Sequence, residues 1–211
     1  MVKKIINLLK NYRAHQVFNP WAEQCTLDAH PNAPQQRRKR LAQHLDNEQA
    51  KLLLIGEASG YQGCRYSGMT FTSERLLLEG AIPRIAPPAK RLTQRKLPFS
   101  EPSATIVWGT LQALGLAEQV ILWNAFPWHP MKGEEPHSNR TPSQQELSDG
   151  LPVLEMLLDH YQGIVIIAVG KKAAHTLTTL GIKPACEVRH PAMGGANKFR
   201  EGMAQFAQST P

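Results

Sequence analysis

The feature that most restricts the fold of this chain is an apolar run, Leu52–Ile55, that stops abruptly at Gly56-Glu57-Ala58-Ser59-Gly60. The run has no alternation of apolar and polar residues, so it predicts a strand buried on both faces, as in a parallel sheet. The glycines and the carboxylate that follow predict a tight loop at the carboxyl end of this strand.

Three later segments repeat the pattern of an apolar strand with a polar or glycine-rich end. They are residues 119–123 before Asn124, 164–169 before Gly170-Lys171, and 184–189 before His190. Helical segments are predicted between the strands, at 73–80, 104–114, 142–161 and 171–181, and others at 1–14, 35–50 and 196–207. Strands that alternate with helices predict right-handed crossovers and an α/β fold, with helices on both faces of a parallel sheet of about four strands.

Several local signals locate the helix starts and the longest loop. Ser73, Ser103 and Thr141 are candidate N-caps, since a hydroxyl oxygen accepts from the free N–H groups of the first turn. The segment 81–102 is rich in proline and basic residues. A loop of this length inside a compact domain predicts a functional or mobile segment.

The charge of the chain points to an anionic partner. The formal net charge is +7 and the pI is about 9.5, and nucleic acid is the commonest partner of such a protein. The basic run Arg37–Arg40 is either a DNA contact or a solvated helix face, and the solvated face is the commoner case.

Cysteine usage and hydropathy exclude other classes. Cys25, Cys64 and Cys186 are isolated and form no Cys-x-x-Cys pair, which disfavours a zinc ribbon or a four-cysteine iron–sulfur cluster. No apolar run reaches the ~20 residues that span a bilayer. The stretch Met1–Leu9 lacks the cleavage site of a signal peptide, so we expect a cytoplasmic protein.

Ligands bind outside the carboxyl ends of the strands in sheets of this kind. Glu57, Asn124, Lys171 and His190 are therefore expected to meet at one rim. An asparagine amide can pair with a carbonyl and an N–H on one base edge, and an anion is favoured at a helix N-terminus such as that of Lys171. The loop at Gly56 matches neither a P-loop nor Gly-x-Gly-x-x-Gly, so a nucleotide-binding enzyme of flavodoxin-like type ranks last.

Four of these segments, in order, resemble motifs of the uracil-DNA glycosylase superfamily. They are Gly56–Gly60 with Phe71, Leu122–Asn124, Val169–Ala174 and His190–Gly194. The resemblance implies a three-layer α/β/α sandwich with a central four-stranded parallel sheet. Its motifs agree in order and spacing over a core of residues 50–205. The length of the chain suits a single domain over 1–211, in which residues 1–34 are predicted to form an N-terminal helix and an irregular lead-in.

The resemblance also implies roles for individual residues. Glu57 is the candidate for holding or activating water, and His190 would donate a hydrogen bond to the departing base. The residues implied in base binding are Gly56, Ala58, Gly60, Phe71 and Asn124. Those implied in DNA contact are Ser59, Gly170, Lys171 and Met193, with Met193 as the wedge that enters the base stack. The partner is DNA containing a damaged base, bound by a monomer, and no metal or organic cofactor is implied.

The chain departs from the family pattern within the first motif. Ala58 stands where the most efficient branch has an aspartate, and Gly60 where that branch has a tyrosine that blocks the thymine methyl. The branch closest in this motif carries a four-cysteine iron–sulfur cluster, which three scattered cysteines cannot supply. We expect a repair glycosylase for uracil or a related deaminated base. The alternatives are a glycosylase for hypoxanthine, xanthine or a mismatched base, and a DNA-binding protein without catalytic activity.

Overall fold

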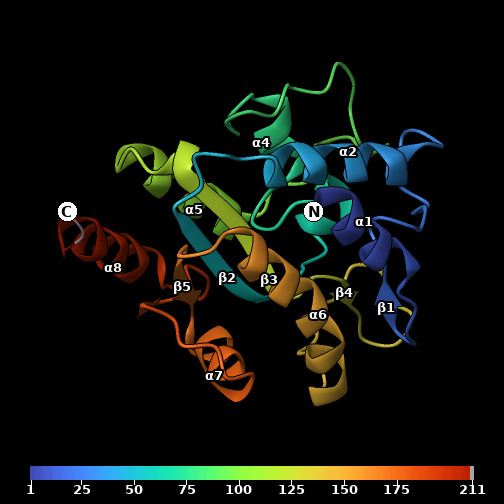
Figure 1. Cartoon of the computed structure of the whole chain (residues 1–211). Coiled ribbons are helices and arrows are strands. Elements are labelled where there is room, and N and C mark those ends of the chain that lie inside the picture. Colours follow the sequence, from blue (N-terminus) through green and yellow to red (C-terminus); the bar gives the residue numbers. More distant parts are fainter. Residues whose placement is uncertain (210–211) are drawn as a thin grey trace.

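A computed structural model describes residues 1–209 of the chain. Its centre is a sheet of four parallel strands in the order β3-β2-β5-β6 (Figure 1). The strands are β2 (Leu52–Ala58), β3 (Val120–Phe126), β5 (Val165–Val169) and β6 (Cys186–Val188). The predicted four-stranded parallel sheet is therefore confirmed.

Helices cover both faces of this sheet and complete a three-layer α/β/α sandwich. One face carries α1 (Val2–Asn11), α2 (Ala33–Leu45), α6 (Gln144–His160) and α7 (Lys171–Thr179). The other face carries α4 (Glu74–Leu78), α5 (Pro102–Ala113) and α8 (Ala196–Ser209). Leu53 and Ile55 of β2 pack into the first core, while Leu52 and Leu54 pack into the second. This alternation explains why the strand is apolar at every position.

Small elements complete the chain between the main helices and strands. They are the helix α3 (Cys64–Ser67), the 3-10 helix η1 (Ala117–Gln119), and the strands β1 (Val17–Phe18) and β4 (His129–Pro130). The two short strands pair antiparallel and form a second, two-stranded sheet. This small sheet was not predicted, because two-residue strands leave no periodic pattern in a sequence.

The first two strands of the main sheet are longer than predicted. Their pairing continues past the apolar run to Ala58 and Phe126, which lie opposite each other. Glu57 and Asn124 therefore lie within the strands, close to their carboxyl ends, rather than in loops. Their backbones are held by the sheet, which fixes the direction of the two side chains.

The helix starts differ from the predicted caps. The cap of α6 is Ser143, not Thr141, and Ser143 forms a capping box with Glu146. The residue at the N-cap position of α5 is Glu101, so Ser103 lies within the first turn of that helix. Ser73 does precede α4, but its side chain makes no capping hydrogen bond.

The basic run at the start of α2 is partly internal. Arg37 is 0% exposed, forms an ion pair with Asp28 and donates to the carbonyl oxygen of Pro20 over 3.0 Å. Arg40 is 8% exposed and donates to the carbonyl oxygen of Ser67 over 2.7 Å. For these two arginines both predicted alternatives, DNA contact and solvated face, are wrong. They satisfy backbone carbonyl groups that the irregular segments leave without partners.

The long segment between α4 and α5 is anchored by one buried carboxylate. Glu74 is 0% exposed and accepts hydrogen bonds from the backbone N–H groups of Leu92, Thr93 and Phe99. The guanidinium of Arg91 also donates to it over 2.8 Å. The segment therefore has a defined path without regular secondary structure.

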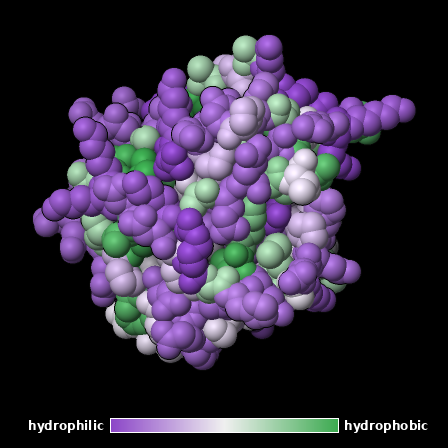
Figure 2. Space-filling model, turned by 90° about the vertical axis from the view of Figure 1, so that its right-hand side faces the viewer, coloured by the Kyte–Doolittle hydropathy of each residue, from purple (hydrophilic) through white to green (hydrophobic). Residues whose placement is uncertain are grey.

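Hydrophilic side chains dominate the molecular face in Figure 2, and hydrophobic ones show only in small separate patches. Among residues 1–209 the large hydrophobic side chains with substantial exposure are Leu8, Leu97 and Met193. No helix within this range has both the length and the apolar character needed to cross a membrane.

Candidate active site

A cavity of about 910 Å³ lies at the carboxyl ends of the central strands. It brings together most of the predicted site residues, namely Glu57, Ala58, Ser59, Gly60, Phe71, Asn124, Gly170, Lys171, His190 and Met193. These residues come from segments more than a hundred positions apart. The parallel sheet places them at one rim, as the strand ends predicted.

Gly56 does not line the cavity but lies directly behind two residues that do. A Cβ at this position would lie 2.6 Å from Oδ1 of Asn124 and 3.0 Å from Cζ of Phe71. Any larger residue would displace both side chains. The glycine therefore allows the amide and the aromatic ring to approach the backbone of β2.

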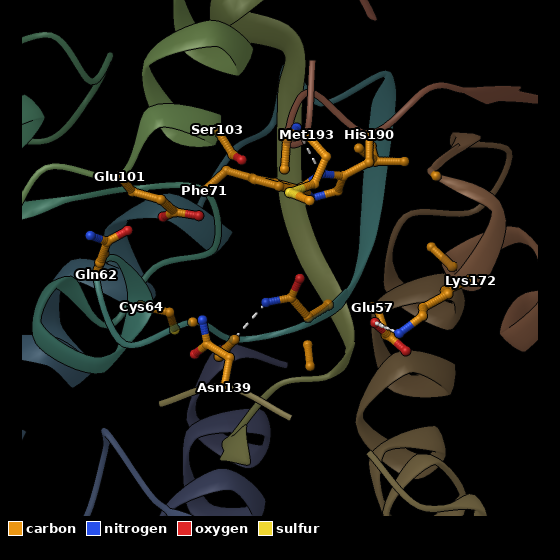
Figure 3. Close-up of a pocket in the computed structure, with 18 of the residues that line it drawn as sticks. Glu57, Gln62, Cys64, Phe71, Glu101, Ser103, Asn139, Lys172, His190 and Met193 are labelled. Atoms are coloured by element: carbon orange, nitrogen blue, oxygen red, sulfur yellow. Dashed lines mark hydrogen bonds and ion pairs between the residues drawn. The ribbon is translucent and has the colours of Figure 1, made fainter. Parts of the chain in front are cut away.

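His190 projects into the cavity close to Phe71, with the two ring centroids 5.9 Å apart (Figure 3). Its Nδ1 accepts the backbone N–H of Ala192 over 3.1 Å, so a neutral ring carries its proton on Nε2. Burial, and secondly the charge of Arg189, lower the pKa of His190 below its usual value. At neutral pH the ring is therefore an uncharged donor through Nε2–H.

The loop after His190 holds its backbone in an unusual shape. Met193 has a φ of +53° and is 94% exposed, although methionine rarely adopts this left-handed conformation. A Cβ at Gly195 would overlap the carbonyl oxygen of His190. The loop is thus compact, and its exposed Met193 side chain is one of those that line the cavity.

Glu57 makes an ion pair that the sequence did not indicate. Its carboxylate lies 3.6 Å from Nζ of Lys172, which also donates to Oγ1 of Thr141 over 2.6 Å (Figure 3). Burial raises the pKa of Glu57, and Lys172 acts in the opposite direction without cancelling this effect. The pairing joins β2 to the start of α7. These two elements are more than a hundred residues apart in the sequence, and the fold brings them together.

Ser59 lines the cavity but is itself largely buried. Its side chain is buried beneath the cavity, 3% exposed, and its hydroxyl donates to the carbonyl oxygen of Pro127. The same oxygen accepts a hydrogen bond from Nδ2 of Asn124 over 3.2 Å. Because Ser59 follows directly on β2, its hydroxyl points inward and supports Asn124.

Among the cavity residues that were not predicted are Glu101 and Asn139. The Glu101 carboxyl caps no helix N–H and instead occupies the space in front of Gly63, where any Cβ would collide with it. Burial raises the pKa of Glu101 to about 7. Asn139 accepts the backbone N–H of Tyr61 over 3.0 Å and so holds the first loop against the segment after β4. Neither residue lies at a strand end, so the pattern that revealed the others could not reveal them.

The cavity offers no evident metal site among the residues that the structure describes. Across residues 1–209, no three side chains of His, Cys, Asp or Glu form a group able to hold an ion. All three cysteines are free, and they lie on α3, on β6 and in the segment before α2.

Comparisons with known proteins agree with this architecture. Residues 43–209 match the family model described as the uracil DNA glycosylase superfamily, whereas no curated protein sequence matches the chain. Among solved structures, the chain is similar to the crystal structure of wild-type Pedobacter heparinus SMUG2. The TM-score is 0.61 at 16% identity, over 99% of this chain and 98% of that one, which shows a shared fold. Because the family model spans most of its length, this chain belongs to the uracil DNA glycosylase superfamily.

Proposed function

We propose that this protein hydrolyses the N-glycosidic bond of uracil in DNA. Membership of the superfamily makes it a DNA glycosylase in general terms, and the choice of uracil is our inference. The observation that carries it is the convergence of a neutral His190, the Asn124 amide and the Phe71 ring on one cavity. These are a donor for developing negative charge, a group for the base edge and an aromatic surface.

Binding requires the target nucleotide to leave the base stack. We propose that the base packs on Phe71, a contact worth ~1–3 kcal/mol for stacking on an aromatic ring. The Watson–Crick edge of the extruded base would contact Asn124, while backbone N–H groups of residues 58–60 would face one of its carbonyl oxygens. Gly56 takes part by leaving room for both side chains.

The surroundings of the cavity suit the DNA backbone. Gly170 and Lys171 lie at the N-terminus of α7, where free N–H groups favour a phosphate. Met193 would fill the gap that the extruded base leaves in the stack. Because the Ser59 hydroxyl is used inside the protein, we propose that Ser59 contacts DNA through its backbone only.

The chemical step follows from these positions. As the bond between the base nitrogen and C1′ breaks, its electron pair remains on the base. The Nε2–H of His190 would stabilise the negative charge on the base carbonyl oxygen, as in an oxyanion hole. A water adds its oxygen to C1′ and gives a proton to Glu57, whose raised pKa suits it as a base near neutral pH. The products are the free base, once protonated, and an abasic site.

One alternative concerns the substrate. The cavity of about 910 Å³ has room for either a pyrimidine or a purine base, so its volume does not select between them. Hypoxanthine, xanthine or a mismatched base therefore forms the second candidate. Ala58, in place of an acid, is the reason to test also for a DNA-binding protein without catalysis.

The test is base release from oligonucleotides that contain uracil, hypoxanthine, xanthine or thymine opposite guanine. Single strands and duplexes are compared, with and without a chelator. We expect His190→Ala to reduce uracil release ~100- to 1,000-fold, the usual effect of removing one oxyanion donor, while DNA affinity persists. His175→Ala is the control, since His175 is exposed on α7 outside the cavity.

Each outcome has a distinct meaning. If only a base other than uracil is released, that base is the substrate and the proposed mechanism is unchanged. No release, together with tight and salt-sensitive DNA binding, would favour the binding-protein alternative.

We further propose a single domain over 1–211 that acts as a cytoplasmic monomer. Limited proteolysis of the purified chain checks the single domain, and light scattering checks the monomeric state. Fractionation of cells checks the location.

A further inference from the structure

The cavity contains two carboxyl groups with different surroundings. Glu57 and Glu101 lie well apart in it (Figure 3). Burial raises the pKa of both groups, and nothing opposes that effect at Glu101. At Glu57, Nζ of Lys172 lies 3.6 Å from Oε2 and favours the charged form of the carboxyl. Within residues 1–209, only Glu57 of the two therefore forms an ion pair.

A third segment of the chain holds Lys172 in this position. Its Nζ donates to Oγ1 of Thr141 over 2.6 Å, in the segment between β4 and α6. The Lys172 side chain is 64% exposed, and an exposed lysine without partners moves among many rotamers. The hydroxyl of Thr141 restricts this motion, so that the ammonium group stays beside Glu57.

The place of Lys172 in α7 gives the pairing a second cause. Lys172 is the second residue of this helix, whose first turn contains no acidic residue. The N-terminus of a helix carries a partial positive charge, which disfavours a lysine there. The Glu57 carboxylate comes from β2 and compensates the charge of Lys172. The pair therefore relieves an unfavourable charge at the start of α7 while it stabilises the charge on Glu57.

The other titratable side chains of the cavity do not form this contact. They are Cys64, Glu101, Arg140, Lys171, Arg189 and His190. Arg140 is paired with Glu146 at 2.6 Å, and the lowered pKa of His190 leaves its ring neutral. Among residues 1–209, Lys172 is the cation in the ion pair of Glu57. Lys172 is thus the side chain through which the protonation of Glu57 can be changed.

We propose that Lys172, anchored by Thr141, is a positioning residue that keeps the Glu57 carboxylate ionised and fixed at the cavity. This inference rests on the proposed function, in which Glu57 accepts a proton from the attacking water. Only the ionised carboxylate can accept that proton, so its fraction limits the rate of base release on the acidic side of the pH profile. Lys172 therefore serves the chemical step, whereas Lys171 is left to contact a phosphate.

The test compares Lys172→Met with Lys172→Arg. Methionine is similar in length to lysine without its charge, whereas arginine keeps the charge. Single-turnover release is measured from about pH 5 to about pH 9 with protein in saturating excess, so that a change in DNA affinity does not alter the rate. For Lys172→Met we expect the acidic limb at higher pH, with release on it about threefold slower, the effect of an exposed ion pair. At alkaline pH the rates converge, and Lys172→Arg stays close to the parent.

Two further comparisons separate the anchor from the phosphate contact. Thr141→Val keeps both charges and removes the hydroxyl, so we expect a smaller shift of the acidic limb in the same direction, and Thr141→Ser restores the parent profile. Lys171→Gln removes the neighbouring cation from the rim of the cavity. It should lower the affinity for DNA and leave the acidic limb at the pH of the parent.

The titration of Glu57 is also followed without DNA, by carbon NMR of isotopically labelled glutamate carboxyl groups. Glu57→Gln identifies the signal, and we expect its midpoint in Lys172→Met to lie above that of the parent. The same midpoint in both proteins would overturn the inference, as would an equal loss of release at every pH in Lys172→Met and Lys172→Arg. A parent that releases no base, or a Glu57→Gln variant as active as the parent, contradicts the proposed role of Glu57 instead. The NMR comparison then still decides whether Lys172 keeps Glu57 ionised.

Discussion

Single side chains in this cavity take their chemistry from fixed neighbours. The tautomer of His190 is set by the N–H of Ala192 and its lowered pKa by burial and Arg189, whereas the raised pKa of Glu57 reflects burial, opposed by Lys172. Glu101 differs, because it lies in the cavity wall without a cation at hydrogen-bond distance among the described residues. Burial alone raises its pKa to about 7.

This shift predicts a pH-dependent stability. The Glu101 pKa is about 4.5 in the unfolded chain and about 7 in the folded protein, so between these values the folded state binds more protons. The free energy of unfolding should therefore fall as pH rises from about 4.5 to about 7, and stay low above that. Glu101→Gln should stabilise the protein by about 1–2 kcal/mol near pH 8, since contact of the carboxyl with water reduces the full effect.

Urea unfolding of the parent and Glu101→Gln across this range measures the difference. Glu201→Gln is the control, since Glu201 is exposed on α8. A gain that is the same at every pH would mean that the Glu101 carboxyl does not titrate in this range.

Among the elements, α7 begins at the cavity rim, and the glycine at its start lies next to His190. Glycines stand at both of its ends, Gly170 with a φ of +93° and Gly181 with a φ of +76°. A Cβ at Gly170 would lie 2.9 Å from Cβ of His190, whereas at Gly181 it would meet no atom within 4 Å. Alanine variants at the two positions therefore distinguish the effect of contact with His190 from the effect of backbone strain at the ends of α7.

We expect Gly170→Ala to reduce base release at least tenfold, because the new methyl group displaces His190. Gly181→Ala should stay within about twofold of the parent, although it loses roughly 1–2 kcal/mol of stability through left-handed backbone. Gly170→Ala loses at least as much stability, because φ +93° with ψ 156° is a conformation essentially restricted to glycine. Single-turnover release, measured well below both unfolding temperatures, checks this. A similar loss in Gly181→Ala would point to a general loosening of α7.

For the whole molecule, the net charge of +7 leads us to expect that the affinity for DNA depends on salt. Each cation that neutralises a phosphate releases a counterion, so the logarithm of affinity should fall linearly with the logarithm of salt, by ~0.9 per contact. We expect Lys171→Gln to lower this slope by about one contact. Lys51→Gln serves as control, because Lys51 is exposed just before the amino end of β2, away from the cavity rim. An affinity that is independent of salt would contradict the proposed backbone contacts.

The sequence by itself determined that the chain forms a parallel sheet and in which order the main helices and strands follow one another along the chain. It also determined the rim of the sheet where the site lies. Those features depend on local patterns, since an apolar strand with a polar end can be recognised without its partners. Tertiary structure alone decided the ion pair of Glu57 with Lys172, the burial of Arg37 and the entry of Glu101 into the cavity. It also decided the orientation of the Asn124 amide. Each of these depends on a contact between residues far apart in the chain, and the energy of such a contact depends on burial and geometry that no local pattern encodes.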